Sequence, residues 1–122
     1  MGVFREVPAV SRLDVRRDAE PQLVADVWLY ETVDGGKAGP ALPGFGCILM
    51  TSRDLPYYGW DALLLLRDQP IHPGERRRLG FVFLTPESAV PIFSQAERFY
   101  LWDGRFVGEA TTVPENELLA RT

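Results

Sequence analysis

Three residue types that carry much of protein chemistry are nearly missing from this 122-residue chain. It has one cysteine, Cys47, one histidine, His72, and one lysine, Lys37. A single cysteine excludes a disulfide within the chain and argues against a zinc site built from protein ligands alone. We therefore expect no bound metal, no cofactor and a reducing environment.

Long hydrophobic runs are also missing. The longest apolar run, residues 62–66, is far shorter than the roughly 20 residues of a membrane-spanning helix. Arg5 and Glu6 interrupt the first ten residues, which is unlike a secretory signal. These features predict a cytoplasmic protein without membrane association.

The chain has little positive charge relative to negative charge, with 13 basic and 17 acidic residues and a net charge of −4. This balance disfavours broad nucleic-acid binding, which depends on neutralising phosphates. The local exception is the run Arg76, Arg77 and Arg78, for which we consider an RNA or phosphate contact. The alternative is that the three arginines form a solvated rim of the barrel. Within a strand away from the rim, Arg77 would point over the barrel interior.

What the chain does have is short β-prone segments between Pro- and Gly-rich turns. They include QLVADVWLY after Pro21, FGCILMTS, and RRRLGFVFL; residues 60–66 fit either a strand or a helical turn. Strands at this spacing predict an all-β fold, a single closed antiparallel β-barrel of about six strands. We expect an N-terminal arm or edge strand over 1–20, the barrel over 21–113, and a tail with one helical turn over 114–122.

The segment RFYLWDGRFVGEA, residues 98–110, is the clearest local signal, because Asp-Gly between two β-prone runs predicts a two-residue hairpin turn. That turn would place Trp102 opposite Arg105, Leu101 opposite Phe106, and Tyr100 opposite Val107. The core face of the hairpin would then hold Phe99, Leu101, Phe106 and Gly108.

The other face of this hairpin would carry an ion pair of Arg98 with Glu109 and a cation–π contact of Arg105 with Trp102. We expect a partner surface there, made by Tyr100, Trp102 and Arg105, since Trp, Tyr and Arg dominate binding hot spots. The alternative is that the N-terminal arm or the tail covers this face. A second aromatic site is expected on a neighbouring loop, at Tyr57, Tyr58 and Trp60.

Four motifs in order give a resemblance to the C-terminal β-barrel domain of elongation factor Tu and related translational GTPases. They are LVADVWLY, DGGKAGPALPGF, the turn Pro73-Gly74-Glu75, and the hairpin RFYLWDGRFVGEA. The resemblance covers about residues 23–112 and implies a barrel without an active site that contacts tRNA and other protein domains. Lys37-Ala38-Gly39 departs from the basic, His-containing sequence of the family, and Glu109 stands where the family has a small residue. No GxxxxGK[ST] motif is present, so GTPase activity is not expected.

Catalytic groups do not converge in the sequence. His72 lies beside a Pro-Gly turn and Cys47 in an apolar strand, where a surface residue and a buried thiol are the simpler interpretations. The acidic residues show no calcium-loop spacing. We therefore predict that the chain is not an enzyme but a non-catalytic module that binds another protein, such as an inhibitor or immunity-like protein. The alternative is a translation-related accessory protein that contacts tRNA or ribosomal RNA.

Overall fold

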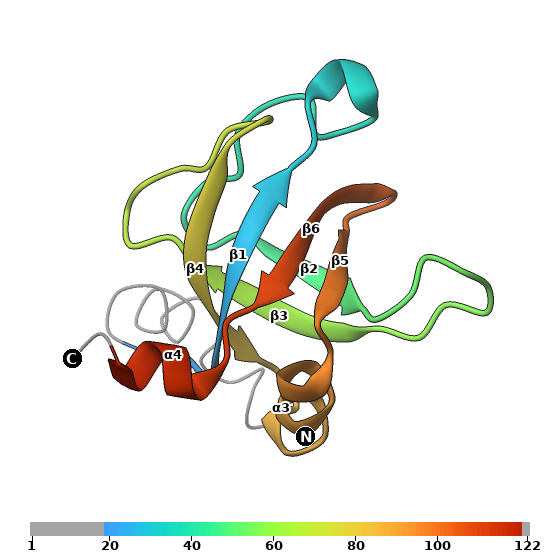
Figure 1. Ribbon diagram of the computed structural model, residues 1–122. Helices are drawn as coiled ribbons and strands as arrows, with labels where there is room; N and C mark the ends of the chain where they lie inside the picture. The colour runs from blue at the N-terminus through green and yellow to red at the C-terminus, as the bar shows by residue number, and fades with distance from the viewer. Residues whose placement is uncertain (1–18, 121–122) are drawn as a thin grey trace, which may run out of the picture.

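Six antiparallel strands close into a barrel (Figure 1). The computed structural model describes residues 19–120. The strands are β1 (Leu23–Leu29), β2 (Gly46–Met50), β3 (Trp60–Leu65), β4 (Arg76–Phe83), β5 (Arg98–Trp102) and β6 (Phe106–Thr112). Their order around the barrel is β1-β4-β3-β2-β5-β6, with β6 pairing back to β1. This confirms the predicted all-β barrel and settles residues 60–65 as a strand.

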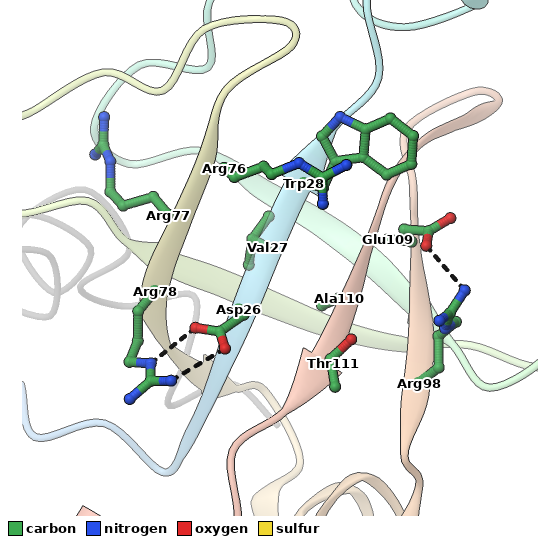
Figure 2. Close-up of a pocket in the computed structure, with 10 residues that line it drawn as sticks. All are labelled: Asp26, Val27, Trp28, Arg76, Arg77, Arg78, Arg98, Glu109, Ala110 and Thr111. Carbon is green, nitrogen blue, oxygen red and sulfur yellow. Dashed lines mark hydrogen bonds and ion pairs between the residues drawn. The ribbon is translucent and has the colours of Figure 1, made fainter.

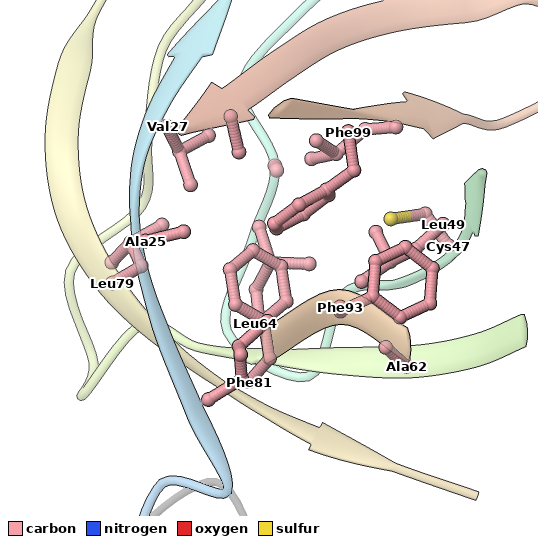
Figure 3. Packing of buried hydrophobic residues seen from close by; sticks show 14 of the residues in the cluster. Ala25, Val27, Cys47, Leu49, Ala62, Leu64, Leu79, Phe81, Phe93 and Phe99 are labelled. Atoms are coloured by element: carbon pink, nitrogen blue, oxygen red, sulfur yellow. The ribbon is translucent and has the colours of Figure 1, made fainter. Parts of the chain in front are cut away.

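Alternation along each strand separates the core from the outer face. In β1, Ala25, Val27 and Leu29 point inward and are almost completely buried, whereas Asp26 and Trp28 point outward. Inward residues of all six strands belong to one buried hydrophobic cluster, part of which Figure 3 shows. At about 25 cal/mol per Å² of apolar surface, this burial is the main favourable term for folding.

One end of the barrel is covered by a helix that the sequence did not indicate. Helix α3 (Pro86–Gln95) inserts Ala89 and Phe93 into the core. The Phe93 ring lies 5.1 Å from the Phe99 ring and 5.5 Å from the Phe83 ring, measured between centroids. Pro86 at the first helical position favours a helix start, and burial of Phe93 offsets the cost of Pro91 inside it.

Two shorter elements complete the described residues. A 3-10 turn, η1 (Thr32–Asp34), follows β1, and helix α4 (Glu115–Ala120) occupies the predicted tail. The arm or edge strand expected over residues 1–20 lies almost wholly outside the described residues.

The β5–β6 hairpin exists, but its predicted register is wrong. Trp102 pairs with Phe106 and Leu101 with Gly108, so the turn has three residues and a bulge follows it. Gly104, with φ +79°, is the one turn residue that has a positive φ. The predicted turn type requires a positive φ at both of its central residues.

The extra residue in the bulge changes which side chains face the core. Val107 is buried and Phe106 lies on the outer face, the reverse of the predicted arrangement. Phe99 and Leu101 are completely buried, as predicted. Gly108 passes so close to β1 that a Cβ there would lie 2.8 Å from the Trp28 carbonyl oxygen, so the pairing of β6 with β1 leaves no room for a side chain at this position.

Candidate functional site

Outward side chains form two cross-strand rows on the face made by β4, β1, β6 and β5. The strand registers align Arg76, Trp28, Glu109 and Tyr100 in the first row. The second row aligns Arg78, Asp26, Thr111 and Arg98. Charged and aromatic side chains that are far apart in the sequence are therefore neighbours on one surface.

Between these rows is a groove of about 420 Å³ (Figure 2). The short side chain of Thr111 lies between those of Asp26 and Arg98 on the neighbouring strands. The residues that line the groove are Asp26, Val27, Trp28, Arg76, Arg77, Arg78, Arg98, Glu109, Ala110 and Thr111.

Two ion pairs border the groove. Arg78 donates to both carboxylate oxygens of Asp26, at 2.7 and 3.1 Å, and lies 3.3 Å from Glu117. The hydrogen bonds from Arg78 lower the pKa of Asp26. Arg98 donates to Glu109 at 3.1 Å, as the sequence predicted, although the two residues are diagonal rather than directly opposite.

A cluster centred on Arg53 joins the groove to the loop between β2 and β3. The Arg53 guanidinium carbon lies 5.0 Å from the centroid of the Phe106 ring and 5.8 Å from those of Tyr30 and Tyr100. Tyr57, from the same loop, packs edge-on against Phe106 with 5.6 Å between centroids. The loop thus lies over the outer face of the β5–β6 hairpin.

Tyr30 connects this cluster to the groove. Its hydroxyl donates to Glu109 Oε1 at 3.0 Å and accepts from Arg53 at 3.4 Å. Its ring is 5.1 Å from that of Trp28, over which Arg76 lies at 4.4 Å. Burial, and then the hydrogen bond to Glu109, raise the pKa of Tyr30 to about 12. We call the set Trp28, Tyr30, Arg53, Tyr57, Arg76, Tyr100 and Phe106 the aromatic–arginine face.

The partner-surface residues expected from the sequence fall into four places. Tyr100 and Trp102 lie on the outer face of β5, each half-buried. Tyr57 and Tyr58 are exposed by 45% and 69% on the β2–β3 loop. Trp60 instead turns toward the core, with its ring 5.6 Å from that of Phe93. Arg105 is exposed in the hairpin turn, and no cation–π contact joins it to Trp102 within the described residues.

The three consecutive arginines begin β4 at the barrel rim, which agrees with the rim alternative. Arg77 donates to Glu75 and to the carbonyls of Gln69 and Pro70, and so ties the preceding turn together. Of the three guanidiniums, only that of Arg76 lacks a carboxylate partner among residues 19–120.

Sequence reasoning missed Arg53, Trp28, Tyr30 and Phe106. Trp28 had a usable signal, since it alternates with inward Val27 and Leu29 in a segment already predicted as a strand. Arg53 had none, because its contacts depend on a loop folding over strands about 50 residues away.

The two candidate nucleophilic and basic groups lie in unrelated environments. Cys47 is buried in the core, and burial raises the pKa of its thiol, so it is protonated at neutral pH. His72 is exposed in the turn before β4, where its backbone N–H donates to Glu75. Within residues 19–120, no three His, Cys, Asp or Glu side chains gather as metal ligands would.

No helix in the part of the chain that the structure describes is long and apolar enough to span a membrane. In comparisons with known proteins, no family model and no curated protein matches the chain.

Proposed function

We propose that the barrel is a non-catalytic module that binds another protein through the aromatic–arginine face. The observation that carries this proposal is the position of Arg53, whose guanidinium lies against three aromatic rings beside exposed Tyr57 and Tyr58. Rigid aromatic side chains with a neighbouring arginine are the composition of binding hot spots.

The surroundings of this cluster support the proposal. Leu55 and Tyr58 are among the most exposed large apolar side chains and lie in the loop that Arg53 and Tyr57 attach to the barrel. The strands beneath are paired on both sides around a closed barrel, which provides a rigid base. Little ordering entropy would then oppose binding.

A second candidate function is contact with tRNA or ribosomal RNA, within a translation-related protein of the elongation-factor-Tu type. The β-barrel and the arginines beside the groove favour it. We rank it second because Arg77, Arg78 and Arg98 already have carboxylate partners and the chain has a net charge of −4. A cytoplasmic location suits both candidates, since the lone Cys47 is free.

A quantitative pull-down from cells that make the protein tests the proposal. The wild type and Val33→Ala, a control at a side chain that is 91% exposed on the η1 turn, should retain the same protein. Arg53→Ala with Tyr57→Ala should lose it while still unfolding in one cooperative transition, with a melting temperature lowered by only a few degrees because both side chains pack on the barrel. Equal retention by all three baits, or loss by the Val33 control, would show that the face is wrongly placed. Ribonuclease-sensitive retention of tRNA would favour the second candidate.

A further inference from the structure

Two arginines of the aromatic–arginine face have no acidic partner. Arg78 and Arg98 are paired with Asp26 and Glu109. Arg53 and Arg76 have no carboxylate within ion-pair distance among the described residues, and each lies over aromatic rings instead.

The nearby carboxylates are already engaged and do not supply that partner. Both oxygens of Glu109 accept hydrogen bonds, Oε1 from Tyr30 and Oε2 from Arg98. Both oxygens of Asp26 accept from Arg78. Among the described arginines of this face and the groove beside it, Arg53 and Arg76 therefore carry the unmatched positive charge.

An arginine that lies over an aromatic ring remains able to bind a carboxylate. The guanidinium presents its face to the ring and keeps its N–H groups at the edge, where two of them can match the two oxygens of a carboxylate. Arg53 uses one nitrogen for a long hydrogen bond of 3.4 Å to Tyr30, and the Arg76 guanidinium makes no hydrogen bond with residues 19–120 that would be lost. Both arginines are exposed, so these N–H groups are accessible to a partner.

Apolar surface lies between these two positions. Trp28 contacts both Arg76 and Tyr30, and Tyr30 contacts Arg53, so the two rings separate the two charges. The groove beside Trp28 leaves space above Thr111 for a side chain (Figure 2).

We propose, granting the protein-binding function above, that the partner presents an acidic segment whose two carboxylates bind Arg53 and Arg76 and whose apolar side chain lies against Trp28 between them. Charge complementarity carries this assignment. A protein segment fits better than RNA, because it matches two discrete charges beside exposed Leu55 and Tyr58. The regularly repeating phosphates of RNA would also meet the carboxylates of Asp26 and Glu109 on the same face.

The test selects binders from a displayed library of random 12-residue peptides, using the full chain as bait at 50 mM salt. Selected peptides should be enriched in pairs of Asp or Glu that flank an aromatic or aliphatic residue. A synthetic peptide of the selected sequence should bind at least about tenfold more weakly when its acids are changed to amides. Its affinity should also fall as salt rises from 50 to 300 mM.

Variants of β4 supply a matched control. Arg76→Gln and Arg78→Gln remove the same charge from the same face, two residues apart, but only Arg76 is unpaired. We expect Arg76→Gln and Arg53→Gln each to weaken the peptide at least about tenfold, with Arg78→Gln changing affinity less than threefold. Arg53→Lys, which keeps the charge without the planar fork, should be intermediate.

Three results would overturn the inference. They are selection of peptides without acidic enrichment, failure to select any peptide, and equal losses in the Arg76 and Arg78 variants, which would indicate general charge attraction. If the selected peptides were neutral and their binding depended on Tyr57, the proposed protein-binding function would be supported and the acidic partner would be ruled out. Competition by tRNA that removes the bound peptide in a manner dependent on Arg76 would identify nucleic acid as the occupant and contradict the proposal.

Discussion

At the scale of single residues, the close contacts at a position, rather than its residue type, decide which substitutions the barrel tolerates. Neither Gly108 nor Gly39 has a positive φ, so other residues could adopt both backbone conformations. A Cβ at Gly108 would collide with the β1 backbone, whereas a Cβ at Gly39 would have no atom within 4 Å. The residue alone does not reveal this difference, because it arises from the pairing of β6 with β1.

We predict that Gly108→Ala destabilises the protein by about 1–3 kcal/mol, because neither strand can move without breaking ladder hydrogen bonds. Gly39→Ala should change the free energy of unfolding by less than about 0.5 kcal/mol. Urea unfolding of both variants measures this. Similar values for the two would mean that β6 does not approach β1 at Gly108.

Tyr30 gives a prediction about pH. Its pKa is raised to about 12 in the folded protein, whereas a tyrosine in the unfolded chain ionises near 10. Between pH 10 and 12, the tyrosine hydroxyl therefore ionises in the unfolded chain but stays protonated in the folded protein. The contribution of Tyr30 to the free energy of folding is complete below pH 10 and is lost as the pH rises toward 12.

The wild type should therefore lose more stability than Tyr30→Phe between pH 9 and 11.5, because the variant lacks this ionisation. Thermal unfolding across that range compares the two proteins. Parallel pH profiles would show that the folded protein does not raise the pKa of Tyr30.

At the scale of elements, the strands could be predicted from the sequence and helix α3 could not. Strand residues such as Ala25, Val27 and Leu29 alternate with outward ones, and that period is visible locally. Helix α3 has only two buried positions, Ala89 and Phe93, and a proline at residue 91, so no helical period is evident. Its stability depends on the barrel end that it covers.

The same reasoning explains which outward positions on this face could be predicted from the sequence. Tyr100 and Trp102 follow from strand alternation, as does the ion pair of Arg98 with Glu109. The outward position of Phe106 does not, because the bulge reverses the alternation after the turn. The contacts of Arg53 depend on how an irregular loop packs, which no local pattern encodes.

We predict that Phe93→Ala destabilises the protein by about 3–5 kcal/mol, since its ring packs among Phe83, Phe99 and Trp60 at the covered end of the barrel. Phe93→Leu should cost less, because it leaves a smaller cavity. Chemical unfolding gives both values. A change below 1 kcal/mol for the alanine variant would mean that α3 is not docked on the core.

At the scale of the whole molecule, a closed barrel leaves binding to its outer surface and loops. All six strands have both neighbours, so a partner has no strand edge to extend in this part of the chain. The described surface offers one place where exposed apolar side chains, aromatic rings and unmatched arginines occur together, the aromatic–arginine face with its β2–β3 loop.

The most direct measurement of this claim is site-specific photo-crosslinking in cells. A photoreactive phenylalanine analogue would replace Tyr58 in one protein and Val33 in another, since both side chains are exposed and neither supports the core. We predict one discrete protein crosslink from position 58, lost when Arg53→Ala is added, and none from position 33. A partner captured at position 33 and absent from position 58 would contradict the account.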